Sequence, residues 1–265
     1  MSGQIVELAG QLAGESSYAY REAIKTLRTN IQFCGSNVRK IMFTSALPDE
    51  GKSQIAVVTA VSLAQIGKKV LLIDADIRKS VLASRYQMKK DVGGLSQYLS
   101  GQKKLEDVIN RTDVENFDII FAGPYSPNPA ELLEEDLFGE LINYGAEQYD
   151  YVILDTPPMG AVIDGAIVAT KCDGAVMVIE SGSISYHLEQ KVKDQLDKSG
   201  CRILGVVLNK VRPDEDPHGK YYGKYGKYGK YGRYGKYYGK YGRYGEGDNS
   251  QSDDGKAGKK GKTGK

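Results

Sequence analysis

Short apolar runs alternate with helical patterns from the start of the chain to about Pro217. The runs are continuous and rich in Val, Ile and Leu, which is typical of strands covered on both faces. They predict strands at Ile41–Ser45, Val70–Asp74, Phe117–Ala122, Tyr151–Asp155, Ala175–Glu180 and Ile203–Asn209. The intervening patterns predict helices at Glu22–Phe33, Ser53–Gln65, Ala130–Glu147, Gly165–Thr170 and Ser185–Ser199. This alternation predicts an α/β fold with a mostly parallel sheet and helices on both faces.

The remainder of the chain, residues 218–265, has a different composition. Residues 218–245 repeat a Lys/Arg-Tyr-Gly unit and contain no aliphatic side chain that could bury a face. Glycine adds to the entropic cost of ordering such a segment. We therefore expect one folded domain, residues 1–217, followed by a disordered Tyr/Gly/Lys-rich C-terminal tail with its tyrosine cluster at 218–245.

Charge divides the chain at the same place. The formal net charge is +2, but residues 218–265 hold 13 basic and 4 acidic side chains, against 23 basic and 30 acidic in residues 1–217. A basic tail on an acidic domain indicates an interaction segment. The three cysteines are widely spaced and form no C-x-x-C pair, which favours a reducing cytoplasm. We find no apolar run of membrane-spanning length and no secretory leader pattern.

A phosphate-binding loop follows the first predicted strand. The segment Ala46–Ser53 matches G-x-x-x-x-G-K-[ST] except that Ala46 replaces the first glycine. Such a loop directs N–H groups at phosphate oxygens, at the positive end of the next helix. Lys52 would reach the β- and γ-phosphates, and the Ser53 hydroxyl would bind Mg²⁺. The expected nucleotide contacts in this segment are Ala46, Pro48, Asp49, Glu50, Gly51, Lys52, Ser53 and Gln54.

Two further predicted strands end in carboxylates. Asp155 ends an apolar strand as a Walker B residue does and would hold Mg²⁺, directly or through water. Asp74 and Asp76 follow another strand and would share one face if its geometry continued. Adjacent carboxylates repel unless a cation lies between them or one is protonated, which favours Mg²⁺ binding and a proton-accepting role. The structural alternative is a solvated acidic loop.

Taken together, these segments resemble a family. The A-x-P-x-E-G-K-S loop, the LLIDADIRKS and LDTPP segments, the NPAELL segment from Asn128 and the tyrosine-rich tail are similar to bacterial tyrosine kinases. More narrowly, they resemble the detached cytoplasmic kinase subunit of capsular and exopolysaccharide systems. The resemblance implies a P-loop NTPase-type fold related to septum-positioning and partition ATPases. It also implies that Lys52 and Ser53 belong to Walker A, Asp74 and Asp76 to Walker A′, and Asp155 to Walker B.

The resemblance implies contacts beyond these motifs. Asn209 would hydrogen-bond the adenine and Arg212 would pack on the purine ring, although both are also common residues at strand exits. A helical motif that packs protomers into a ring reads Glu22-x-x-Lys25-x-x-Arg28 here. Lys25 departs from the family's arginine and lacks its planar fork. The alternative for this motif is an exposed charge row.

The partners that the resemblance implies are a membrane-bound polysaccharide co-polymerase as activator, further copies of the chain in a ring, and a cognate protein-tyrosine phosphatase. Other protein substrates are possible, and no nucleic acid partner is expected. The chain would be cytoplasmic and recruited to the inner face of the cell membrane by its activator.

We therefore expect an ATP- and Mg²⁺-dependent protein-tyrosine kinase that autophosphorylates its tail and regulates polysaccharide synthesis and export. Lys52 would neutralise charge, Asp74 would act as the base, and Asp76 would lie near Mg²⁺. The expected acceptors are Tyr221, Tyr222, Tyr225, Tyr228, Tyr231, Tyr234, Tyr237, Tyr238, Tyr241 and Tyr244.

Two other functions fit parts of the sequence. A partitioning or positioning ATPase would share the P-loop, but its relatives carry a second lysine early in the loop, where this chain has Leu47 and Pro48. Alternatively, the basic aromatic tail could bind polyanions by charge and stacking, which is compatible with a kinase.

Overall fold

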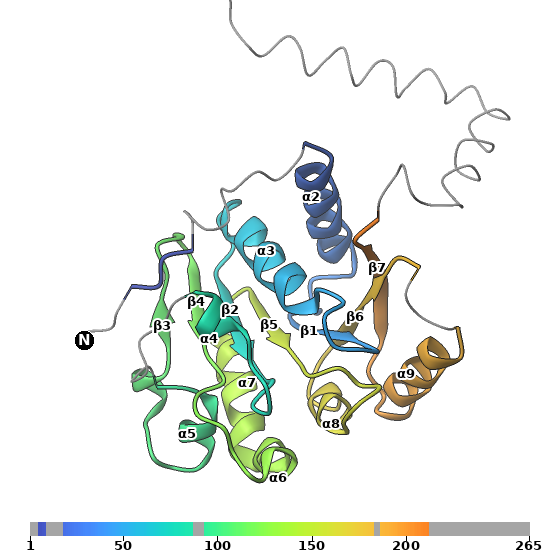
Figure 1. Ribbon diagram of the computed structural model, residues 1–265. Helices are drawn as coiled ribbons and strands as arrows, with labels where there is room; N and C mark the ends of the chain where they lie inside the picture. The colour runs from blue at the N-terminus through green and yellow to red at the C-terminus, as the bar shows by residue number, and fades with distance from the viewer. Residues whose placement is uncertain (1–4, 9–17, 87–92, 183–185, 212–265) are drawn as a thin grey trace, which may run out of the picture. The chain divides into compact units, whose positions relative to one another are not determined.

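A seven-stranded sheet runs through the part of the protein that the computed structural model describes, residues 5–8, 18–86, 93–182 and 186–211 (Figure 1). The strands are β1 (Lys40–Ser45), β2 (Val70–Asp74), β3 (Asn110–Arg111), β4 (Phe117–Ile120), β5 (Tyr151–Asp155), β6 (Gly174–Glu180) and β7 (Ile203–Asn209). They lie in the order β3-β4-β2-β5-β1-β6-β7, and every pairing is parallel except that of β3 with β4. The mostly parallel α/β sheet is therefore confirmed.

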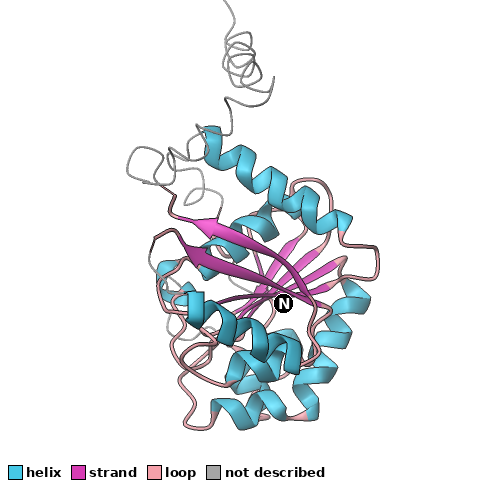
Figure 2. Ribbon diagram, turned by 90° about the vertical axis from the view of Figure 1, so that its right-hand side faces the viewer, coloured by secondary structure: helices cyan, strands magenta, loops and turns pink. Residues whose placement is uncertain are grey.

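Helices cover both faces of this sheet, as Figure 2 shows from the side. They are α2 (Tyr18–Phe33), α3 (Lys52–Ala64), α4 (Leu82–Arg85), α5 (Leu95–Leu99), η1 (Leu105–Asp107), α6 (Pro129–Glu134), α7 (Asp136–Gln148), α8 (Asp164–Ala169) and α9 (Tyr186–Lys198). One buried apolar cluster joins the sheet to α2, α3 and α4, and the other joins it to α5, α6, α7, α8 and α9. Along β2, alternate side chains enter the two clusters, so the strand is buried on both faces.

Two local features differ from the sequence prediction. The helix expected over Ala130–Glu147 is two helices, because the backbone at Glu135 is extended, with ψ 145°, between α6 and α7. The antiparallel strand β3 and the short helices α4 and α5 were not predicted, since each is too short to show a period. Within the described residues no helix is long and apolar enough to cross a bilayer.

The order of the strands predicts a ligand site at the carboxyl end of β1. From β1 the chain passes through α3 to β2 on one side, whereas β6 pairs with β1 on the other side. Ligands of open α/β sheets bind at the carboxyl ends of the strands where the order reverses in this way. The loops after β1, β2 and β5 all leave from these ends. The expected tail, residues 218–265, lies outside the described residues.

Candidate active site

The loop after β1 has the backbone shape of a phosphate-binding loop. Asp49 and Gly51 both have positive φ, 64° and 91°, in the left-handed region where the chain turns back on itself. Gly51 then caps α3, so the loop ends at the positive end of that helix. A Cβ atom on Gly51 would lie 2.2 Å from Nδ2 of Asn209, which explains why this position needs glycine. Ala46 is buried at the loop's start.

The buried Glu50 side chain stabilises the loop through hydrogen bonds, although the sequence predicted it as a nucleotide contact. Its Oε2 accepts a hydrogen bond from the backbone N–H of Leu47 at 2.8 Å. Its Oε1 accepts from the N–H of Glu180, at the end of β6, at 3.2 Å. Asn209, at the end of β7, donates from Nδ2 to the Glu50 carbonyl at 2.9 Å. The loop is therefore tied to the ends of two strands that are distant in sequence.

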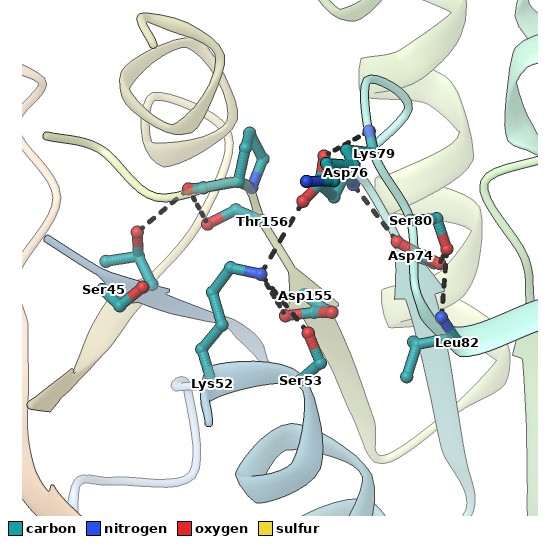
Figure 3. A network of polar contacts seen from close by, with 12 residues as sticks. Ser45, Lys52, Ser53, Asp74, Asp76, Lys79, Ser80, Leu82, Asp155 and Thr156 are labelled. Atoms are coloured by element: carbon teal, nitrogen blue, oxygen red, sulfur yellow. Dashed lines mark hydrogen bonds and ion pairs between the residues drawn. The ribbon is translucent and has the colours of Figure 1, made fainter. Parts of the chain in front are cut away.

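Lys52 extends between two carboxylates (Figure 3). Its Nζ lies 3.7 Å from Oδ2 of Asp76 and 3.7 Å from Oδ1 of Asp155, and it donates to the Ser53 hydroxyl at 3.3 Å. The Asp155 side chain is buried, and its Oδ1 has no hydrogen-bond partner among the described residues. Burial raises the pKa of Asp155, and Lys52 and Ser53 oppose that rise. The Walker A and Walker B residues thus meet in one place.

Asp74 and Asp76 point to different partners, because the strand geometry that would have put them on one face does not continue past Asp74. The Asp74 carboxylate accepts hydrogen bonds from the Ser80 hydroxyl and from the Asp76 N–H, while Asp76 turns toward Lys52 (Figure 3). Asp74 lies opposite Asp155 in the register of β2 and β5. Burial, and then the charge of Asp155, raise the pKa of Asp74 well above its usual range.

Lys52, Ser53 and Asp76 line a cavity of about 430 Å³, which is large enough for a nucleotide, and Asp155 lies behind them. Asp76 lines the cavity and Asp74 does not. The first wall is the P-loop, the second is the segment after β2, and the third is the segment after β5. The lining residues are Pro48, Asp49, Gly51, Lys52, Ser53, Gln54, Asp76, Arg78, Lys79, Val81, Arg85, Pro157, Pro158, Ala161, Val162 and Lys210.

Three sequence-predicted nucleotide contacts do not line the cavity. Ala46 and Glu50 are buried in the base of the loop, and Asn209 contacts the loop through Glu50. Arg212 lies outside the described residues. Lys210, which was not predicted, lines the cavity and pairs with Glu180 at 3.0 Å.

The charge row expected to join protomers makes contacts within the described part of the chain. Lys25 and Glu22 form an exposed pair at 2.8 Å. Arg28 instead donates from Nη1 to the backbone carbonyl of Ser62, on α3, at 3.2 Å. Arg28 therefore helps to attach α2 to α3, whereas the other two side chains are available on the surface. Whether this row joins protomers stays a prediction.

Known proteins share this arrangement. A family profile described as an AAA domain matches residues 39–193. The chain is 42% identical over 205 residues to the tyrosine-protein kinase CpsD of Streptococcus agalactiae, covering 77% of this chain and 90% of that protein. The kinase domain of the Escherichia coli tyrosine kinase ETK superposes with a TM-score of 0.73 and 33% identity, over 78% of this chain and 82% of that one.

The expected relationship to septum-positioning ATPases is also found. The septum site-determining protein MinD of Pyrococcus horikoshii, solved with Mg-ADP, has a TM-score of 0.57 and 25% identity over 69% of this chain and 75% of its own. The P-loop NTPase fold is therefore confirmed. The higher identities belong to tyrosine kinases.

Replacing Lys52 tests the site directly. Lys52→Met should weaken ADP binding and lower catalytic turnover by about 10²–10³-fold, because a cation at the phosphates is lost. It should also lower the melting temperature more at pH 8 than at pH 5. Without the ammonium, the pKa values of the buried carboxyl groups rise further, and stability is then lost as pH rises through them.

Titration with a fluorescent ADP and thermal melts at both pH values would measure these effects. Lys79→Met is the control, because Lys79 lines the same cavity but its side chain forms no ion pair with the described residues. Equal nucleotide affinity in Lys52→Met and the native protein would contradict the assignment.

Proposed function

The chain belongs to the bacterial tyrosine-protein kinases, and we propose that it transfers the γ-phosphoryl group of Mg-ATP to tyrosines of its own C-terminal tail. The observation that carries this proposal is the position of Lys52, at the start of α3, between Asp76 and Asp155 at the edge of a nucleotide-sized cavity. Phosphoryl transfer requires positioning and charge neutralisation more than covalent chemistry by the protein. A P-loop and a lysine at one end of the cavity meet that requirement.

Magnesium suits the donors that are present. The hydroxyl of Ser53 and the carboxylates of Asp76 and Asp155 are hard oxygen ligands of the kind Mg²⁺ prefers. The buried Oδ1 of Asp155 has no hydrogen-bond partner among the described residues, so a cation there would meet an unsatisfied acceptor. We infer that these three side chains hold the ion. When bound, it would neutralise charge on the phosphate oxygens.

The base for the phenolic proton is one of two aspartates: Asp74, which ends β2, or Asp76, which follows it. The sequence favoured Asp74, and that assignment stays a prediction. Asp76 lines the cavity, whereas Asp74 is buried and bonded to Ser80. A base must come within hydrogen-bond reach of the proton that it removes. We therefore infer that Asp76 contacts the reacting groups and that Asp74 supports it, by accepting a hydrogen bond from the Asp76 N–H at 3.2 Å.

The tail is the proposed acceptor because of its composition. Its ten tyrosines stand among six lysines and two arginines in residues 218–245. If the segment behaves as the flexible chain that its composition predicts, its ends would lie about 30 Å apart on average, and it could reach its own site or that of a neighbouring copy. Each phosphate adds about −1.5 to −2 charges, so four or five phosphates would cancel the basic charge. Phosphorylation would then weaken any contact between the tail and the acidic domain.

The biological setting follows from family membership rather than from the site. We propose that a membrane-bound polysaccharide co-polymerase activates the kinase at the inner face of the membrane, that a tyrosine phosphatase reverses the reaction, and that the cycle regulates capsular or exopolysaccharide export. The activator's cytoplasmic segment, added as a peptide to purified kinase, should raise the rate of tail phosphorylation. An unchanged rate would argue against activation by that segment.

Substitution of the two aspartates distinguishes their roles. Asp76→Asn should lower turnover by about 10²–10³-fold, because it removes a charged group at the reacting phosphates. Asp74→Asn should raise the melting temperature of the nucleotide-free protein by about 2–4 °C, because it removes a buried carboxyl group beside Asp155. Its effect on turnover should be smaller than that of Asp76→Asn. Steady-state phosphorylation and thermal melts measure both, and a larger loss of turnover in Asp74→Asn would return the base to Asp74.

Replacement of all ten tail tyrosines by Phe tests the acceptor. Total phosphotyrosine formed with Mg-ATP, measured by mass spectrometry, should fall at least about 10-fold, because the proposed acceptor hydroxyls are absent. This variant, mixed with a Lys52→Met chain that keeps its tail, should phosphorylate that chain if transfer occurs between copies. High phosphotyrosine in the all-Phe protein alone would refute the tail as the main acceptor.

Assembly through α2 is tested on its two exposed residues. Glu22→Ala with Lys25→Ala should shift large particles toward monomer in light scattering, while the bond from Arg28 to Ser62 keeps α2 in place. An exposed ion pair contributes little to stability, so folding should be preserved. The control is Lys193→Ala, which breaks a similar exposed pair with Asp197 on α9. Unchanged particle size in the double variant would assign the row to the solvated surface.

A further inference from the structure

A bidentate ion pair between Arg78 and Asp164 connects the segment after β2, which lines the cavity, to the start of α8. Nε of Arg78 donates to Oδ2 of Asp164 at 2.5 Å, and Nη2 donates to Oδ1 at 2.9 Å. Parallel bonds of this kind fix both distance and orientation. Asp164 is fully buried at the start of α8, whereas the Arg78 side chain is 38% exposed and lines the cavity. The pair therefore lies at the boundary between the core and the site.

The two segments that this pair connects lie next to two of the three proposed magnesium ligands, Asp76 and Asp155. Arg78 stands two residues after Asp76, and the loop between them is tightened by the Lys79 N–H, which donates to Oδ1 of Asp76 at 3.0 Å. Asp164 begins the helix that follows the segment after Asp155. The carboxylates of Asp76 and Asp155 lie at the same distance, 3.7 Å, from Lys52. Strand pairing fixes Asp155, so the spacing of the two carboxylates depends on how the loop that carries Asp76 is held.

We propose that the Arg78–Asp164 pair positions the magnesium site by holding the loop of Asp76 at a fixed distance from the end of β5. This inference rests on the proposed binding of Mg²⁺ at Ser53, Asp76 and Asp155. Arg78 acts through Asp76, so it is a positioning residue. Residues that orient metal ligands in this way commonly change metal affinity or activity by about 10–100-fold when they are replaced.

Stability alone does not account for the pair. Desolvation of a buried charge offsets much of the attraction to its partner, and an apolar pair of similar size is often as stable. Removing only one partner is different, since it leaves an uncompensated charge. Replacing both residues by apolar ones therefore distinguishes an effect on folding from an effect on the position of Asp76. Such a variant keeps the packing but lacks the bidentate contact.

The experiment uses the full chain and measures ADP binding by fluorescence, first in EDTA and then as Mg²⁺ is added. In Arg78→Met with Asp164→Leu, the melting temperature and the ADP affinity in EDTA should stay near those of the native protein. The Mg²⁺ concentration that gives half of the metal-dependent change in ADP binding should rise about 10–100-fold. Arg78→Lys, which keeps the charge but not the fork, should show an intermediate rise.

Lys40→Met is the matched control. It breaks an ion pair with Asp173, 3.6 Å apart at the opposite end of the strands, and should leave the Mg²⁺ requirement unchanged. A native Mg²⁺ requirement in the double variant would overturn the positioning role. So would an equal loss of ADP affinity in EDTA, since that would make Arg78 a direct nucleotide ligand.

If the double variant does not fold, Arg78→Lys decides, and a native Mg²⁺ requirement there overturns the proposal. The magnesium site itself is tested separately by the native protein. If native ADP binding does not respond to Mg²⁺, the site fails and the proposal fails with it. If the native protein responds and the variants respond identically, only the positioning proposal fails.

Discussion

The ammonium group of Lys52 is the charge on which the site depends. Three carboxyl groups, from Asp74, Asp76 and Asp155, are buried or nearly buried at the ends of β2 and β5, and Lys52 is the cation that two of them meet in the described structure. Buried carboxylates are costly unless they are paired or hydrogen-bonded. Burial, and then the negative charge of Asp155, raise the pKa of Asp74 well above its usual range. Such a site favours the arrival of a further cation.

The fold concentrates these charges through strand register. Parallel strands bring their carboxyl ends to one edge of the sheet, and the pairing of β2 with β5 puts Asp74 opposite Asp155. The loop from β1 then starts α3 beside them, with Lys52 as its first residue. Apolar burial on both faces sets the register, since a shift of one residue would turn the core side chains to the wrong face. The site is thus a product of core packing as much as of its own motif.

Features formed by residues close together in the sequence could be predicted, whereas contacts between residues far apart in the sequence could not. The P-loop, the six parallel strands and the carboxylates at strand ends are local patterns, and each was readable from spacing. The hydrogen bond between Glu50 and Glu180 spans 130 positions in sequence, and the Arg78–Asp164 pair spans 86. No local pattern encodes such contacts. The directions of Asp74 and Asp76 depend on the backbone beyond the strand: β2 stops at Asp74, as predicted, and the loop that follows it shows no period from which the direction of Asp76 could be read.

These long-range contacts explain how a loop that begins with alanine can keep the P-loop shape. A first glycine would leave that turn free to adopt several conformations. Here the Glu50 carboxylate holds the turn, because it accepts the Leu47 N–H within the loop and the Glu180 N–H at the end of β6, and Asn209 fills the space beside Gly51. The same logic holds on the far side of the cavity, where Arg78 and Asp164 fix the loop that carries Asp76. In both places a buried carboxylate links two segments: Glu50 accepts from a backbone N–H at the end of β6, and Asp164 accepts from the side chain of Arg78. Preorganisation of this kind lowers the cost of ordering the site when a charged ligand arrives.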